Sequence, residues 1–254
     1  MNIVVCAKQV VDVSEIKVDS KTNKPVLSGI PEKISDIDKN AMEEAIKIKE
    51  KHNGKITVIT YGPENAKEKI KELLAMGADE GIHIPQLETS DYYMVSTYLA
   101  AAIKKIKEYD IILCGEASID LFSGQIGPRI AGILDIPQIT YAQSVTVEKD
   151  KLTSVRNLGD QAVTIQSSYP VLLTVTKEIN EPRLPSLMQI LGAANKPIHT
   201  WNASELISEP VKPKISTIDI QGVSMDRKNV IYTDDIDESI NKLVDNLIKE
   251  GVLR

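Results

Sequence analysis

Short apolar runs alternate with helical stripes through the first 134 residues, and no other feature constrains the fold of this chain as much. The runs occupy residues 2–6, 55–61, 81–84 and 110–114. Between them, apolar residues recur at the spacing of amphipathic helices, as they do from Val95 to Ile106. This alternation predicts βαβ units, and therefore an α/β fold with a doubly wound, mostly parallel sheet.

The pattern changes after Pro137. Residues 144–148 and 151–156 alternate between polar and apolar side chains, and Lys149-Asp150 separates them like the turn of a hairpin. Two further strand-like runs follow at 162–166 and 171–175. We therefore expect an antiparallel extension on the parallel sheet.

The C-terminal part of the chain has the composition of an arm that ends in a helix. Proline, serine and lysine recur between Ile198 and about Thr233. Asp234 and Asp235 then precede a helical apolar face, and Gly251 ends it. The residues of that face are Ile236, Ile240, Leu243, Val244, Leu247 and Ile248.

Composition narrows the classes of function. The net charge of −6 leaves no basic stripe, so we expect no nucleic-acid partner. No run of about 18 apolar residues occurs and the chain enters a strand directly, so we expect no membrane span, no signal peptide and a cytoplasmic location. Cys6 and Cys114 each end an apolar run, as buried thiols do. The three histidines are isolated and no catalytic motif occurs, so we predict no metal site and no catalytic residue.

The strand that ends at Cys114 leads into a candidate binding loop. In open parallel sheets, ligands bind beyond the carboxyl ends of the strands. The loop from Ser118 reaches Ser123-Gly124-Gln125-Ile126-Gly127-Pro128, where the two glycines allow close approach of a ligand. Ser123 can cap the following helix, whose free N–H groups suit a phosphate. We interpret this loop as a nucleotide site; the alternative is a capped helix that packs tightly on its own sheet.

The segment from Thr176 to Pro197 is too apolar for a simple linker. It contains three prolines and has no clean helical or strand period. It nevertheless carries Leu184, Leu187, Met188, Ile190 and Leu191. We interpret it as a surface that docks on a partner. The alternative is a long loop that covers its own core.

Several strings along the chain resemble the β subunit of electron-transfer flavoproteins. They are V-V-C-A-K-Q-V from Val4, D-K-N-A-M-E-E-A from Asp38, A-M-G-A-D from Ala75, S-I-D-x-x-x-G-Q-I-G-P-R from Ser118, P-Q-I-T-Y from Pro137 and V-T-K-E-I-N-E-P-R-L-P-S-L from Val175. The last string is the most specific, and the resemblance runs the length of the chain.

The resemblance implies a heterodimer with a larger α subunit, in which the β chain holds an adenine nucleotide. It implies a nucleotide-binding domain over residues 1–197, a partner-recognition loop at about 181–196, and an arm and helix over 198–254 that dock on the partner subunit. It also implies that Leu184, Leu187 and Met188 contact a partner dehydrogenase, with Leu187 as the anchor. The nucleotide contacts fall on Cys6, Ala7, Ser35, Asp38, Tyr61, Ser118, Asp120, Ser123, Gly124, Gln125, Ile126, Gly127 and Arg129.

The nucleotide is FAD in one branch of the family and AMP in the other. Residues 17–23 and Asp38-Lys39-Asn40 look more like the electron-bifurcating branch, which favours FAD. The chain departs from the family pattern at Glu116, Ala117, Phe122 and residues 155–160.

Two functions therefore stay open. The first is an electron carrier between NADH, a partner flavin-dependent dehydrogenase and a low-potential acceptor such as ferredoxin. The second is a subunit that holds structural AMP and has no redox centre of its own, so that the only redox flavin lies in the α subunit.

Overall fold

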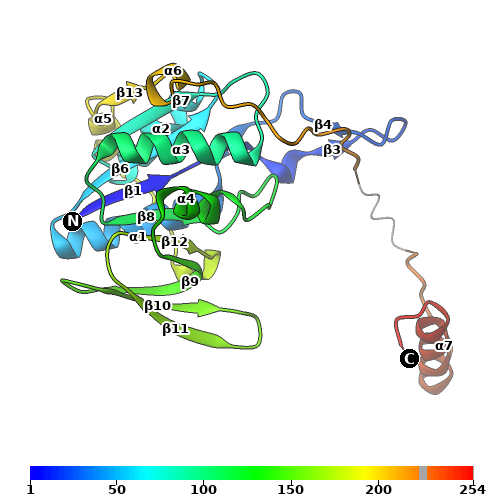
Figure 1. Ribbon diagram of the computed structural model, residues 1–254. Helices are drawn as coiled ribbons and strands as arrows, with labels where there is room; N and C mark the ends of the chain where they lie inside the picture. The colour runs from blue at the N-terminus through cyan, green and yellow to red at the C-terminus, as the bar shows by residue number, and fades with distance from the viewer. Residues whose placement is uncertain (223–227, 254) are drawn as a thin grey trace.

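The computed structural model describes residues 1–222 and 228–253. The main sheet of this described part has nine strands (Figure 1). In spatial order they are β11 (Ala162–Ser167), β10 (Leu152–Asn157), β9 (Gln138–Val147), β12 (Val171–Val175), β8 (Ile111–Gly115), β1 (Asn2–Cys6), β6 (Lys55–Gly62), β7 (Glu80–Pro85) and β13 (Ile198–Thr200).

The sheet is parallel from β9 to β13 and antiparallel from β9 to β11. From β1 the chain first builds β6 and β7 on one side, and then returns to build β8 and β12 on the other. The strand order therefore reverses between β1 and β8, which is where open α/β sheets bind ligands. The predicted α/β fold, with its mostly parallel sheet and antiparallel extension, is confirmed.

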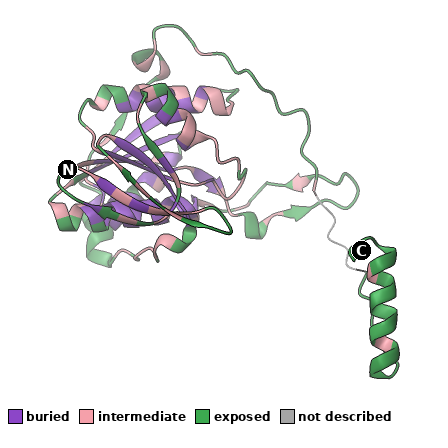
Figure 2. Cartoon of the chain, turned by 60° about the horizontal axis from the view of Figure 1, so that its bottom comes forward, coloured by how far each residue is buried: buried purple, intermediate pink, exposed green. Residues whose placement is uncertain are grey.

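Helices cover both faces of the parallel part of the sheet. One face carries α1 (Asp36–His52), α2 (Ala66–Met76) and the short α5 (Leu187–Ala193), and the other carries α3 (Tyr92–Ile106) and α4 (Ile126–Leu134). In β1, Ile3 and Val5 face the first layer, whereas Val4 and Cys6 face the second. Both faces of the strand are buried, which explains its continuous apolar run (Figure 2).

Two small ladders shape the polar excursion between β1 and α1. β2 (Gln9–Val11) pairs with β5 (Glu32–Ile34), and a 3-10 turn, η1 (Val13–Glu15), follows β2. β3 (Lys17–Val18) pairs with β4 (Pro25–Val26) and projects from the body in Figure 1.

The sequence predicted an extended arm directly after Ile198, but the chain first stays in contact with the body. β13 adds an edge strand beside β7, and Trp201 packs against the core on the α3 side, followed by the one-turn helix α6 (Ala203–Leu206). The extended part begins after these contacts and crosses the β3–β4 ladder. There Lys24 pairs with Asp219 at 3.5 Å, and the N–H of Gly222 donates to the carbonyl of Asn23 at 2.7 Å.

The predicted C-terminal helix is present as α7 (Ile236–Lys249). The side chain of Asp235 caps it by accepting hydrogen bonds from the N–H groups of Asp237 and Glu238. α7 stands apart from the body in Figures 1 and 2, and none of its residues is buried. Within residues 1–222 and 228–253, every helix is too short or too polar to cross a membrane.

Candidate functional site

Asp38, in the first turn of α1, joins the carboxyl ends of β1 and β8. Its Oδ2 accepts a hydrogen bond from the backbone N–H of Lys8 at 2.8 Å, and its Oδ1 accepts one from the backbone N–H of Gly115 at 3.1 Å. Residue 115 has to be glycine, because a Cβ there would lie 2.6 Å from Asp38 Oδ1. The Asp38 carboxyl therefore fixes the two strands where the strand order reverses. Gly115 was not among the predicted site residues, although a glycine at the end of a buried strand is a readable signal.

Burial raises the pKa of Asp38 to about 7, while the hydrogen bonds from Lys8 and Gly115 act in the opposite direction. The folded chain thus holds this proton more tightly than the unfolded chain, in which the pKa is near 3.8. Asp38 therefore stabilises the fold below pH 3.8, and that contribution is lost as the pH rises through 7.

We expect this loss to be visible in the isolated chain. Between about pH 4 and pH 7, the free energy of unfolding should fall by at most roughly 4 kcal/mol on account of Asp38. Asp38→Asn cannot titrate, so the difference in free energy between wild type and variant should change over this range. Urea unfolding at a series of pH values measures the free energy of unfolding of both proteins. If the two free energies change with pH in the same way, the expectation is contradicted.

The loop from Ser118 to Phe122 is tied to β1 and to the start of α1. The Nζ of Lys8 lies 2.6 Å from Asp120 Oδ2 and 3.4 Å from the hydroxyl oxygen of Ser118. The N–H of Ile119 donates to the hydroxyl of Ser35 at 3.3 Å. Burial opposes the ionisation of Asp120, but hydrogen bonds from Lys8 and Ser118 outweigh it and hold its pKa below the usual value.

Five of the predicted site residues thus lie in or next to one connected network. Ser35, Asp38, Ser118 and Asp120 belong to it directly, and Ala7 precedes Lys8 in the chain. Sequence reasoning missed Lys8, whose ammonium group links β1 to the loop. Cys6 ends β1 and pairs in register with Cys114 of β8, and both thiols are free and buried.

The glycine-rich part of the loop leads into α4 with an open helix start. Gly124 has a φ of +64°, which favours glycine. The helix begins at Ile126, so Gln125 is the N-cap residue and Ser123 is not, contrary to the sequence prediction. The side-chain oxygen of Gln125 accepts from Arg129 at 2.8 and 3.0 Å, and no side chain caps the helix. The first N–H groups of α4 are therefore available to an anion.

Gly127 faces the sheet and not the loop. A Cβ at this position would lie 2.5 Å from Thr174 Cγ2 and 3.4 Å from Leu172 Cδ2, both on β12. The glycine therefore allows α4 to pack closely on that strand, which is one of the two readings that the sequence left open.

Tyr61 is turned away from the Asp38 network. Its hydroxyl lies 2.7 Å from that of Ser90 and accepts from the N–H of Leu87 at 3.0 Å. Its ring stacks on Tyr98, with centroids 6.1 Å apart. Tyr61 therefore lies on the β6 side of the site, and no hydrogen bond in the described chain joins it to Lys8, Asp38 or Asp120.

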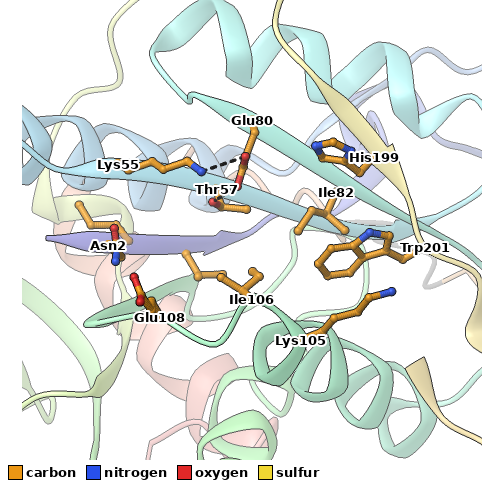
Figure 3. A pocket seen from close by; sticks show the side chains of 12 residues that line it. Asn2, Lys55, Thr57, Glu80, Ile82, Lys105, Ile106, Glu108, His199 and Trp201 are labelled. Atoms are coloured by element: carbon orange, nitrogen blue, oxygen red, sulfur yellow. Dashed lines mark hydrogen bonds and ion pairs between the residues drawn. The ribbon is translucent and has the colours of Figure 1, made fainter. Parts of the chain in front are cut away.

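Two hollows lie at opposite ends of the strands. One, of about 540 Å³, adjoins the candidate loop and is lined by Glu116, Tyr141 and Thr176, among others. Burial and the nearby Glu178 raise the pKa of Glu116. The other, of about 410 Å³, lies at the amino ends of β1, β6 and β7, where Lys55 and Glu80 pair at 3.0 Å (Figure 3). The residues around this second hollow include none of the predicted site residues.

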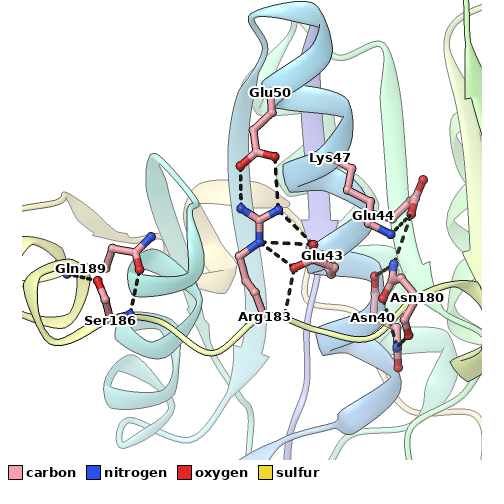
Figure 4. Close-up of polar contacts among 9 residues, drawn as sticks. All are labelled: Asn40, Glu43, Glu44, Lys47, Glu50, Asn180, Arg183, Ser186 and Gln189. Atoms are coloured by element: carbon pink, nitrogen blue, oxygen red, sulfur yellow. Dashed lines mark hydrogen bonds and ion pairs between the residues drawn. The ribbon is translucent and has the colours of Figure 1, made fainter.

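The predicted docking residues lie on an exposed apolar ridge. Leu184, Leu187 and Met188 are 92%, 70% and 77% exposed. Sequence reasoning expected no helix here, but α5 begins at Leu187. A capping box starts it: Ser186 accepts from the N–H of Gln189, and Gln189 accepts from the N–H of Ser186 (Figure 4).

Residues 24–206 match the sequence family described as "Electron transfer flavoprotein domain". The chain is 41% identical to the electron transfer flavoprotein subunit beta of Thermoanaerobacterium thermosaccharolyticum, over 100% of both proteins. It is also 41% identical to the protein of the same name from Clostridium acetobutylicum, over 81% of this chain and 80% of the relative. A subunit of the caffeyl-CoA reductase-Etf complex of Acetobacterium woodii, CarD, is 38% identical over 83% of this chain and 81% of the relative.

These matches span the Asp38 network, the loop at 118–125 that precedes α4 (the α4 loop) and residues 181–196. The chain therefore belongs to the electron transfer flavoprotein family and is similar to its beta subunits along its whole length.

Proposed function

We propose that the chain binds FAD at the α4 loop and, with an α subunit, passes electrons between NADH, a partner dehydrogenase and a low-potential acceptor such as ferredoxin. The observation that carries the proposal is the uncapped start of α4 beside Gly124, held at the point of strand reversal by Asp38 and by the Lys8–Asp120 pair. The similarity to a subunit of a caffeyl-CoA reductase-Etf complex supports a dehydrogenase partner. We place the complex in the cytoplasm.

The residues around the loop fit the diphosphate of a dinucleotide. The amide groups of Gly124, Gln125 and Ile126 would donate to phosphate oxygens, with the helix dipole favouring negative charge there. Lys8 is already paired with Asp120, so backbone groups are the main donors. When bound, the flavin supplies one- and two-electron redox chemistry. The chain's own part is to bind and orient it, and to fix the surface on which the dehydrogenase docks.

The alternative proposal is a subunit that holds structural AMP. The same loop would bind its single phosphate, and the only redox flavin would lie in the α subunit. The departures at Glu116, Ala117 and Phe122 lie in or directly before this loop and are compatible with either nucleotide.

Counting nucleotides in the purified αβ complex decides between the two. Two FAD molecules per complex would support the electron-carrier proposal, whereas one FAD and one AMP would support the alternative. A complex with one FAD and no nucleotide on this chain would remove the site altogether. Extraction followed by chromatography, together with the flavin absorption spectrum, gives the amounts of FAD and AMP and so distinguishes the three outcomes.

We further propose that α7 docks on the α subunit. Its apolar face is exposed along the helix, with Ile236 at 78% and Ile248 at 54%, although such faces are normally buried. Deleting Asp235–Arg254 should therefore weaken assembly with the α subunit by at least about tenfold, since several apolar side chains lose their contact.

The same deletion should leave the melting temperature of the isolated chain nearly unchanged, because α7 has no buried residue. Titration of the α subunit and thermal melting measure the two effects. A truncated chain that assembles normally but melts much earlier would show that α7 packs on its own domain.

A further inference from the structure

The docking segment, defined here as residues 181–196, is fastened to the body at both ends. Asn180 and Arg183 hold its start against α1 (Figure 4). Lys196 holds its end against the last turn of α2. Between these fastenings, five apolar side chains are more than half exposed, namely Leu184, Leu187, Met188, Ile190 and Leu191.

Arg183 forms the stronger fastening at the start. Its Nε and one terminal nitrogen bind both oxygens of Glu43, at 2.9 and 3.0 Å, and the backbone N–H of Arg183 donates to the same carboxylate at 3.1 Å. The guanidinium also reaches both oxygens of Glu50, at 2.5 and 3.2 Å. The hydrogen bonds that Arg183 donates to Glu50, and then those to Glu43, hold the pKa of Arg183 above its usual range. The side chain of Glu43 is only 5% exposed, so loss of Arg183 would leave a buried carboxylate without its ion-pair partner.

Asn180 adds a reciprocal pair of hydrogen bonds one turn earlier on α1. The side-chain amide of Asn40 donates to the carbonyl of Asn180 at 2.7 Å, and that of Asn180 donates to the carbonyl of Asn40 at 3.1 Å. Side-chain amides bound to backbone carbonyls fix the direction of the chain as it enters the segment.

Lys196 fastens the other end. Its Nζ donates to the carbonyls of Leu74 and Ala78 at 2.8 and 2.6 Å, where α2 ends and its dipole favours a cation. Burial, with Lys49 nearby, lowers the pKa of Lys196, whereas Asp79 acts in the opposite direction. A partly buried ammonium with two carbonyl acceptors is a specific attachment, not a solvated surface charge.

We infer that Arg183 and Lys196 are positioning residues for docking. They hold the exposed apolar side chains between Leu184 and Leu191 (the apolar ridge) in one conformation in the unbound protein. A surface fixed in advance loses less conformational freedom on binding. α1 also carries Asp38, so the helix that holds the start of the segment also fixes the ends of β1 and β8 beside the candidate nucleotide site. The inference rests on the proposed docking function of this segment.

Arg183→Gln in the αβ complex tests it. We expect the KM for the partner dehydrogenase to rise about tenfold, with kcat and nucleotide content unchanged, because the ridge must be ordered during binding. Amide hydrogen exchange over 184–191 should become faster. Since the substitution leaves Glu43 buried and unpaired, the double variant Glu43→Gln/Arg183→Gln removes that charge and should show the same rise in KM. Lys67→Gln is the control: it removes an exposed ion pair with Glu64 at the start of α2, and it should change neither the KM nor the exchange rates. No hydrogen bond or ion pair among the described residues joins this pair to the segment or to Asn180.

The possible outcomes distinguish failure of this inference from failure of the proposed docking function of residues 181–196. If Leu187→Ala raises the KM but both Arg183 variants leave it and the exchange rates unchanged, the fastening has no role in docking and the inference is overturned. If none of these variants affects the KM, the docking function itself is wrong. A rise in KM with unchanged exchange rates would also overturn the inference, because the ridge would then have kept its order.

Discussion

Gly127→Val is expected to remove bound nucleotide from this chain while the flavin of the α subunit survives. The new Cβ would lie 2.5 Å from Thr174 Cγ2, and both Thr174 and Leu172 are buried in a strand that has neighbours on both sides. The strand cannot yield, so α4 must move away from it and take the start of the helix and Gly124 with it. Overpacking of this kind costs about 1–3 kcal/mol, and a β-branched side chain lies at the upper end.

Gly132 provides the matched control, because it lies in the same helix and a Cβ there meets nothing within 4 Å. Gly132→Ala should keep its nucleotide and gain up to roughly 1 kcal/mol of stability from helix propensity. Nucleotide extraction and thermal melting of both variants in the αβ complex measure these effects. A folded Gly127→Val complex that retains both nucleotides would show that the position of α4 does not determine binding.

The elements that follow from local pattern were predictable from the sequence. β1 reads as a central strand because both of its faces are buried, and α7 reads as a helix because its apolar residues share one face. β13 has only three residues and exists through its pairing with β7, so no local signal marks it. α5 was not predicted, because it has only seven residues and follows Pro182 and Pro185, so that the segment shows no clear helical period.

The location of the candidate site was predictable from the sequence, but the hydrogen bonds and ion pairs that join its residues were not. Strand ends and glycines located the loop at 118–129, but the ion pair between Lys8 and Asp120 joins residues 112 positions apart. The role of Asp38 also depends on Gly115, which only the fold brings beside it. The side-chain direction of Gly127 could not be read from its neighbours, because a glycine for packing and a glycine for a ligand look alike in sequence.

The exposed leucine of the docking segment gives the other large expected effect. Leu187→Ala should weaken binding of the partner dehydrogenase about ten- to a hundredfold, the usual result of truncating a buried apolar anchor at an interface. Because Leu187 is 70% exposed in this chain, it has few internal contacts to lose. Electron transfer at low partner concentration should therefore fall, while nucleotide content and the melting temperature stay nearly constant.

Ile218→Ala is the control for Leu187→Ala, since Ile218 is 98% exposed and lies outside the docking segment. It should leave the KM for the dehydrogenase unchanged, so that a change confined to Leu187 reflects its position and not the loss of any exposed apolar group. The alternative role for Leu187, pinning its own loop, requires the opposite result. A large fall in melting temperature with unaltered partner affinity would establish that role and would leave the ridge without a docking function.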